Sequence, residues 1–193
     1  MCGRYQFSEN ESAGISRIIR DINAKYGGDA WRPGEIRPTA AAPVLIPGES
    51  AARAELFSWG FRTPRSLVIN ARAETAMEKP LFRRSVAEQR CIIPSTGFYE
   101  WDSEKRKYFF TVPGETELFM AGLYAVFDGK PCYCILTTRA NESMREIHDR
   151  MPLVLIGDQM ESWLNDPKET VTILRAVPPK LERVSMEAQT SLW

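Results

Sequence analysis

The residue with the most distinctive chemistry is Cys2, which directly follows the initiator methionine in Met1-Cys2-Gly3. Removal of Met1 leaves an amine and a thiol on neighbouring carbons. A free α-amine has a reference pKa of about 7.7–8.0, so part of it is unprotonated at neutral pH and can attack an aldehyde to form a Schiff base. The thiol can then add to the imine carbon and close a thiazolidine ring. This start indicates an aldehyde trap, although a cysteine here can equally be a tolerated start residue.

Two further residues are candidates for proton transfer. His148 is the only histidine of the chain, and histidine ordinarily titrates near neutral pH, which suits a proton shuttle. Glu100 lies in Phe98-Tyr99-Glu100-Trp101, and strand alternation would put it on the face of Phe98, opposite Tyr99 and Trp101. A carboxylate among aromatic side chains suits a general acid or base. A surface histidine and a solvated glutamate at a strand edge are the alternatives.

Asn70 and Arg72 follow the apolar run 67–69 and fall on one face if that strand continues through them. An amide and a guanidinium that point the same way suit sugar or phosphate oxygens. Glu74 can equally be a structural partner of Arg72. This segment is therefore a second candidate part of a site.

Arginines near aromatic residues suggest contact with nucleic acid. Arg4, Arg72 and Arg83 would form a patch that follows a phosphate backbone if they converge on Cys2. Trp59 lies near these arginines in the sequence and would stack on bases, although core packing is the more frequent use of a tryptophan.

Composition limits the class of protein. The 193 residues fit one domain, residues 1–193, and a hydrophobic content of 44% indicates a folded globule. Lys and Arg together number 25, as do Asp and Glu, so any anionic ligand must be bound by a local basic patch. The four cysteines form no CxxC pair and only one histidine accompanies them, so we expect free thiols, no metal and no cofactor. No signal peptide or long apolar span is present, which predicts a cytoplasmic protein without a membrane segment. We also expect a monomer and, if the arginines bind nucleic acid, a nucleoid-associated protein.

The hydrophobic pattern predicts an α+β fold with a curled, mainly antiparallel, barrel-like β core and flanking helices. Ile15, Ile18, Ile22 and Tyr26 recur at helical spacing before Gly27-Gly28, which predicts an amphipathic helix. Further helices are expected at 80–89 and 159–164. Strands are expected at 44–46, 56–61, 67–70, 91–93, 97–101, 108–112, 118–120, 123–127, 133–138, 151–156 and 171–174.

Together these segments resemble the SOS response-associated peptidase (SRAP) family, the abasic site processing proteins. The matching blocks are Met1-Cys2-Gly3-Arg4-Tyr5, Trp59-Gly60-Phe61, Asn70-Ala71-Arg72-Ala73-Glu74-Thr75, Lys79-Pro80-Leu81-Phe82-Arg83, Arg90-Cys91, Pro94, Gly97-Phe98-Tyr99-Glu100-Trp101, Thr137-Thr138, Ala140-Asn141 and Ile147-His148-Asp149-Arg150-Met151-Pro152. They run in family order over most of the chain, which is hard to produce by chance.

The resemblance implies a groove for single-stranded DNA with Cys2 at its floor. Cys2 would capture the ring-opened aldehyde of an abasic site as a thiazolidine and so protect the lesion. Asn70 would hold the α-amine and contact the sugar, Glu100 would assist ring opening and Schiff-base chemistry, and His148 would shuttle protons. By the same resemblance, Arg72 would hold phosphates, with Arg4, Arg83 and Thr138 as weaker candidates. An abasic-site lyase reaction is an expected side activity.

The family name also implies a peptidase, which would expose Cys2 by removing a leading peptide. Because only Met1 precedes Cys2, ordinary methionine removal would suffice. Relatives often carry a wedging tryptophan in the loop before the Asn-Ala-Arg block, where this chain has Thr63-Pro64-Arg65-Ser66. That difference affects how bases would be unstacked at the lesion.

Two other functions remain open. The first is an N-terminal cysteine nucleophile amidohydrolase, because class II glutamine amidotransferases also begin Met-Cys-Gly; there the thiol attacks an amide. The second is a single-strand binding module in which Cys2 is incidental. Glutaminase turnover would favour the first, and a Cys2→Ala variant with unchanged DNA binding and function would favour the second.

Overall fold

The fold is built around a ring of strands that closes on itself. In the computed structural model, which describes residues 2–9 and 12–186, β12 pairs with β4, β4 with β3, β3 with β8, β8 with β11, and β11 again with β12. These strands are β3 (Ala41–Ile46), β4 (Arg53–Trp59), β8 (Arg90–Ser95), β11 (Leu118–Phe127) and β12 (Lys130–Arg139). Every pairing in the ring is antiparallel except β12 with β4. The expected α+β class and mainly antiparallel, barrel-like core are confirmed.

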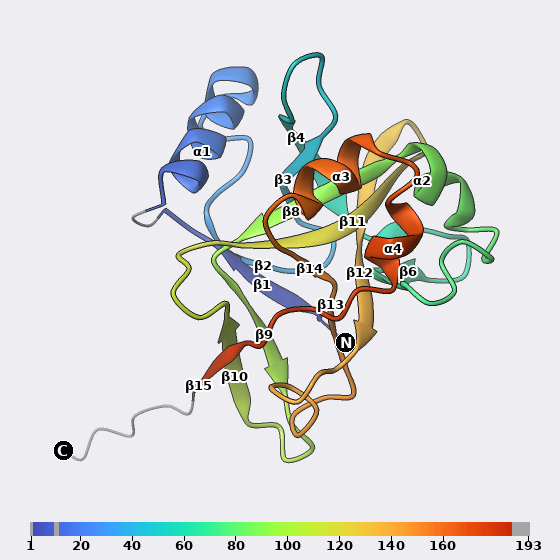
Figure 1. Ribbon diagram of the computed structural model, residues 1–193. Helices are drawn as coiled ribbons and strands as arrows, with labels where there is room; N and C mark the ends of the chain where they lie inside the picture. The colour runs from blue at the N-terminus through green and yellow to red at the C-terminus, as the bar shows by residue number, and fades with distance from the viewer. Residues whose placement is uncertain (1, 10–11, 187–193) are drawn as a thin grey trace.

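A second, antiparallel sheet lies beside the ring and carries the start of the chain (Figure 1). Its strand order is β15-β10-β9-β1-β2. The strands are β1 (Arg4–Phe7), β2 (Gly34–Ile36), β9 (Gly97–Trp101), β10 (Lys107–Thr111) and β15 (Glu182–Ser185). Because β1 pairs with β9, this sheet fixes Cys2 near the strand that bears Glu100.

Short strands flank the second half of β12. β7 (Asn70–Arg72) pairs with it in parallel, and β13 (Arg150–Pro152) pairs with it antiparallel. Thr137 is the register partner of both Arg72 and Pro152, so β7 and β13 lie on opposite edges of β12. Of the remaining strands, β5 (Phe61–Arg62) and β6 (Leu67–Val68) form a hairpin, and β14 (Val154–Leu155) pairs with β11.

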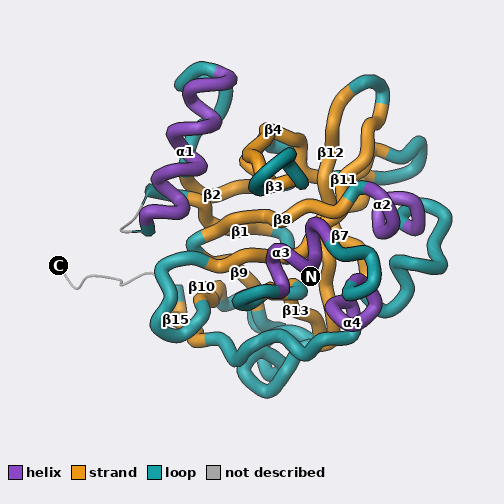
Figure 2. Tube along the Cα trace, turned by 45° about the horizontal axis from the view of Figure 1, so that its top comes forward, coloured by secondary structure: helices purple, strands orange, loops and turns teal. Residues whose placement is uncertain are grey.

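The helices lie outside the strands, and each has a local reason for its position. α1 (Ala13–Tyr26) begins where Ser12 Oγ accepts a hydrogen bond from Ile15 N at 3.1 Å, and it ends at Gly27, whose φ of 84° favours glycine. Its buried isoleucines confirm the predicted amphipathic helix. α2 (Arg83–Glu88), α3 (Gln159–Asn165) and α4 (Thr170–Leu174) gather on the other side of the molecule, as Figure 2 shows. Among the described residues no helix has both the length and the apolar composition needed to cross a membrane.

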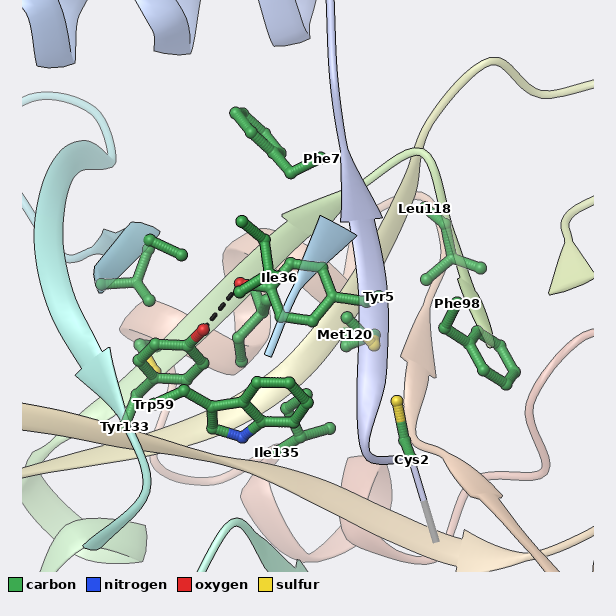
Figure 3. Packing of buried hydrophobic residues seen from close by; sticks show 14 of the residues in the cluster. Cys2, Tyr5, Phe7, Ile36, Trp59, Phe98, Leu118, Met120, Tyr133 and Ile135 are labelled. Carbon is green, nitrogen blue, oxygen red and sulfur yellow. Dashed lines mark hydrogen bonds between the residues drawn. The ribbon is translucent and has the colours of Figure 1, made fainter. Parts of the chain in front are cut away.

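Two clusters of buried side chains form the core. The first contains Cys2, Tyr5, Trp59, Phe98 and Tyr133, with the Tyr5 and Tyr133 hydroxyls 2.6 Å apart (Figure 3). The second lies beneath α2, α3 and α4 and is centred on residues such as Trp163, whose Nε1 donates to Cys91 O at 2.9 Å. Each buried aromatic side chain removes about 150–250 Å² from water, so these clusters supply much of the stability. Cys2 is thus anchored in the main core.

The structure differs from the predicted elements at several places. Residues 118–127 form one continuous strand, because Gly122 has no side chain to meet Ile93, whose Cδ1 would lie 2.1 Å from an added Cβ. The predicted strand at 171–174 is wrong: these residues belong to helix α4. Burial of Thr170, Ile173 and Leu174 at helical spacing outweighs the strand propensity of their β-branched side chains. The predicted strand 151–156 is two short strands, β13 and β14, and strands β2 and β15 were not predicted.

Candidate active site

Cys2 is held in the core just before β1. Its side chain is 1% exposed and belongs to the first core cluster, and its Sγ lies 3.7 Å from Arg4 O as a weak donor. Burial raises the pKa of the Cys2 thiol well above its ordinary value, and the negative charge of Glu100 raises it further. The thiol is therefore protonated at neutral pH, and Glu100 lies close enough to influence it.

Asn70 makes the direct contact with Cys2. Its Nδ2 donates to Cys2 O at 3.0 Å from strand β7. Its Oδ1 is buried and accepts no hydrogen bond from the described residues. A buried amide oxygen that accepts no hydrogen bond costs free energy. This oxygen is therefore suited to accept a hydrogen bond from a group that is present in another state of the site.

Glu100 is buried on β9, with 5% of its surface exposed. Its Oε1 accepts from Trp101 N at 3.3 Å. The predicted alternation is confirmed, because Tyr99 and Trp101 lie on the opposite face, where Lys107 Nζ stands 3.9 Å and 5.7 Å from their ring centroids. β9 thus separates a buried carboxylate from an aromatic and cationic outer face.

His148 lies between two groups that compete for the same ring nitrogen. Nδ1 accepts from Arg150 N at 2.9 Å and also lies 2.9 Å from Asp149 Oδ1. The first contact requires an unprotonated Nδ1, which leaves the proton of a neutral ring on Nε2, whereas the second is favourable only when Nδ1 carries a proton. The two contacts therefore favour different protonation states of the ring.

A half-buried ion pair joins Glu74, which follows β7, to Arg150 on β13. Arg150 donates from both terminal nitrogens to Glu74, at 2.7 and 2.9 Å, and also to Thr137 O at 2.6 Å. The Arg150 guanidinium holds the pKa of Glu74 below its ordinary value. The alternative pairing of Glu74 with Arg72 is wrong, since Arg150 takes that place. The Glu74–Arg150 pair therefore ties the segment after β7 to β13 across β12.

Arginines form a basic cleft next to this ion pair. A cavity of about 410 Å³ is lined by Arg72, Arg139, Ala140, Arg145, Asp149 and Arg150. Arg72 and Arg139 are exposed and form no ion pair within the described part of the chain, whereas Arg145 lies 3.5 Å from Glu142. We call these residues the arginine cleft. Arg72 is two residues from Asn70, so the cleft begins about 7 Å along β7 from the residue that holds Cys2.

The other predicted DNA-binding residues are dispersed. Arg4 lies on the outer face of its sheet, 3.2 Å from Glu35 and 5.2 Å from the Trp101 ring centroid. Thr138 lines a larger cavity beside the arginine cleft, and Arg83 borders a third cavity at α2. Convergence of Arg4, Arg72 and Arg83 on Cys2 is therefore not seen.

Trp59 has a structural role, which corrects its assignment to base stacking. It is fully buried, its ring stacks on Tyr133 with centroids 6.2 Å apart, and its Nε1 donates to Ile69 O at 3.0 Å. A ring with no exposed surface cannot stack on a base. The nearby hydrogen bond to Ile69 instead fixes the chain just before Asn70.

Sequence reasoning assigned no role to Arg139, Arg145 or Arg150. Arg139 directly follows Thr138, and Arg150 lies in the His148 block, so both were next to predicted residues. Their convergence with Arg72 depends on β7 and β13 pairing with opposite edges of β12, which no local pattern reveals. Within the residues that the structure describes, no group of three or more His, Cys, Asp or Glu side chains is placed to hold a metal ion.

The comparisons agree with this fold. Residues 1–190 match the family model described as SOS response associated peptidase (SRAP), and the chain belongs to that family. It is 36% identical over 187 residues to the abasic site processing protein YoaM of Bacillus subtilis, covering 88% of this chain and 81% of YoaM. It is 27% identical to the abasic site processing protein YedK of Escherichia coli over 176 residues, covering 85% and 79% of the two chains. A crystal structure of a protein from Bacteroides thetaiotaomicron aligns with a TM-score of 0.79 at 25% identity, covering 97% and 93%.

Proposed function

We propose that this protein processes abasic sites in single-stranded DNA by covalent capture of the lesion at Cys2. The observation that carries the proposal is the hydrogen bond from Asn70 Nδ2 to Cys2 O at 3.0 Å, made by a residue two positions from the arginine cleft. It supports an arrangement in which one strand, β7, carries both the residue that holds Cys2 and an arginine of the proposed phosphate-binding surface. Membership of a family whose relatives are named abasic site processing proteins supports the same substrate.

The proposed reaction begins after Met1 is removed. The Cys2 α-amine attacks the aldehyde carbon of the ring-opened sugar, and the resulting carbinolamine loses its hydroxyl as water to give an imine. The Cys2 sulfur then adds to the imine carbon, and the thiol proton ends on the nitrogen. One carbon–nitrogen bond and one carbon–sulfur bond form, and one water leaves. No oxidant, metal or cofactor is consumed.

Three side chains would serve these steps. Asn70 Oδ1, which accepts no hydrogen bond from the described residues, would accept one from the new α-amine and orient it toward the sugar. Glu100 is buried and interacts electrostatically with the thiol, so its carboxylate would carry the protons that the amine loses to the departing oxygen, which leaves as water, and would then carry the thiol proton to the imine nitrogen. His148 would supply and accept protons; its Nδ1 contacts Arg150 N and Asp149, two residues that line the arginine cleft.

The state of the thiol favours this order over the alternative amidohydrolase. In that mechanism the thiolate is the attacking group and the amine is its base. Here burial and Glu100 raise the pKa of the Cys2 thiol, which disfavours the thiolate. A buried and protonated sulfur is consistent with a reaction in which the amine attacks first. The thiol of the same residue then adds to the imine.

The DNA would approach along the arginine cleft. Arg72 and Arg139 are exposed and have no carboxylate partner within residues 2–9 and 12–186, so both are available for phosphates, and Arg145 adds a third cation. Thr138 lines the neighbouring cavity and precedes Arg139, which lines both that cavity and the cleft. Arg4 is paired with Glu35, so it would contact DNA only by exchanging that partner.

A lyase side reaction follows from the same intermediate. The imine acidifies the protons on the sugar carbon next to it, and a base can remove one of them. The phosphate on the following carbon then leaves with its bonding electrons, which breaks the strand. Closure of the thiazolidine removes the imine and so suppresses this cleavage, which supports a protective role.

The test is a mixture of Met1-processed protein and a single-stranded oligonucleotide that carries one abasic site. We expect a denaturation-resistant adduct on a gel with the native chain and none with Cys2→Ala or with an undamaged strand. An adduct that persists in Cys2→Ala would contradict the proposal. Absence of an adduct together with glutaminase turnover would favour the amidohydrolase.

A further inference from the structure

A large cavity next to the arginine cleft is not used by the chemistry at Cys2. It measures about 600 Å³, within the range of pockets that bind small molecules. Its apolar wall includes Met77, Val171, Leu174, Val177 and Pro178. Val177 is 80% exposed and Met77 is 49% exposed, so large apolar side chains meet solvent here. We call this cavity the apolar pocket.

The apolar pocket is continuous with basic surfaces on two sides. Arg139 and Ala140 line both the pocket and the arginine cleft. On another side, Met77 and Val171 also line the smaller cavity that Arg83 borders. An apolar surface that lies between arginines on both sides matches a nucleic acid strand, in which an apolar base alternates with anionic phosphates.

The polar groups of the pocket also suit a base. Glu78 is exposed on its rim and offers carboxylate oxygens to base N–H groups. Arg139 and Arg175 offer N–H groups to base carbonyl and ring nitrogen atoms. Asn141 is committed to the fold, because its Nδ2 donates to Pro178 O and Pro179 O at 3.0 and 2.9 Å, and this contact holds the Pro178 wall in place.

We propose that the apolar pocket binds one unpaired nucleobase of the strand that carries the lesion, at a fixed distance from the abasic site. This rests on the proposed function, since it assumes that the strand enters the arginine cleft. Apolar side chains contact the faces of the base, while Arg72 and Arg139 hold the phosphates before it and Arg83 those after it. The protein would then recognise a neighbour of the lesion as well as the lesion itself.

The test uses a series of single-stranded oligonucleotides with one abasic site each. In each member, one nucleoside at a successive position on either side of the lesion is replaced by tetrahydrofuran, which lacks both base and aldehyde. We expect adduct formation to slow at one position on one side only, by about fivefold, which corresponds to about 1 kcal/mol of lost base contact.

The assignment to the pocket is tested with Val177→Glu. This residue is highly exposed, so the variant should fold. We expect it to capture the oligonucleotide without tetrahydrofuran about fivefold more slowly than the native chain does. Its rate should no longer depend on where tetrahydrofuran is placed. Val126→Glu is the matched control, because Val126 is 60% exposed on β11, lies outside the lining of the pocket and changes the net charge equally. It should behave as the native chain.

The outcomes separate the two proposals. An adduct whose rate is the same for every member of the series would overturn the pocket but leave the function standing. A positional effect that survives unchanged in Val177→Glu would place the base elsewhere and also overturn the pocket. If no member of the series gives an adduct, the proposed function itself fails.

Discussion

In the proposed reaction, burial of the Cys2 side chain favours one order of the chemical steps. Burial and the charge of Glu100 raise the pKa of the thiol, so we propose that the α-amine forms the first bond. Asn70 is the residue that fixes Cys2 relative to the arginine cleft, since its side chain holds the Cys2 carbonyl. In this proposal, reactivity depends on the position of the Cys2 α-amine more than on an activated sulfur.

Replacement of Asn70 by Asp tests this positioning. Asn70→Asp keeps the size of the side chain but replaces the Nδ2 donor with a carboxylate oxygen, which repels Cys2 O. We expect adduct formation to slow by about tenfold to a hundredfold, as small displacements of reacting groups do. The rate is measured on gels under single-turnover conditions. Asn165→Asp, exposed at the end of α3, is the control, and equal rates for the two variants would contradict the role of Asn70.

At the scale of elements, β12 organises the site because β7 and β13 pair with its two edges. The Glu74–Arg150 ion pair reinforces this arrangement across the strand. Arg150 N also donates to His148 Nδ1, so the same residue positions the proposed proton shuttle.

Arg150→Lys tests the ion pair. A lysine keeps the charge but cannot make the two parallel hydrogen bonds to Glu74 and the further one to Thr137 O. We expect a loss of about 1–3 kcal/mol in the free energy of unfolding, measured with urea, and slower adduct formation. Arg145→Lys, whose arginine is exposed and lies 3.5 Å from Glu142, should change stability by less than about 0.5 kcal/mol. Similar losses in both variants would show that the ion pair has no special role.

Helix α1 is attached to β4 through another buried carboxylate. Burial disfavours the charge of Glu55, but hydrogen bonds from Lys25 and Tyr26 outweigh burial and hold the pKa of Glu55 below its ordinary value. A carboxyl group whose pKa is lower in the folded state stabilises the fold above its unfolded pKa of about 4.3 and loses that contribution as the pH falls through the folded pKa.

Glu55→Gln tests this attachment through its pH dependence. We expect the variant to have a lower Tm than the native chain at pH 7, corresponding to about 1–2 kcal/mol, because partly exposed Lys25 and Arg53 can recover some hydration. The Tm difference should shrink as the pH falls below about 4.3, since protonation removes the same charge from native Glu55. A difference that stays constant from pH 7 to pH 3 would mean that the charge of Glu55 is unimportant.

Local patterns predicted the elements better than they predicted the site. The alternation around Glu100 and the isoleucine spacing of α1 are short-range signals, and both predictions were confirmed. The arginine cleft depends on pairing between segments far apart in the chain, so only Arg72 could be chosen from sequence. Trp59 and the segment 171–174 were misassigned because burial, which a single sequence does not show, decided their roles.

At the scale of the whole molecule, the equal numbers of basic and acidic residues leave DNA attraction to a local surface. Figure 1 places α1 at the opposite side of the molecule from α2 and α4, next to which the proposed path of the strand runs. Binding before the covalent step should therefore depend on a few arginines and fall with salt.

The salt dependence of binding gives a count of these contacts. For Cys2→Ala, which binds without capture, we expect log K to fall with log salt at a slope of about −0.7 per phosphate contact, or about −2 for three contacts. Arg72→Ala and Arg139→Ala should each make the slope about 0.7 shallower. Arg17→Ala on α1 is the control and should leave it unchanged. Equal effects of all three substitutions would argue against a defined cleft.

The central claim is tested most directly by the intact mass of the adduct and the site of its bond. The protein without Met1 is mixed with the abasic oligonucleotide, and the complex is weighed, digested and sequenced by mass spectrometry. We predict a mass equal to the sum of the two partners minus one water, with the sugar attached to the peptide that begins at Cys2. A bond at a lysine or at one of the buried cysteines Cys91, Cys132 and Cys134 would contradict the proposed capture.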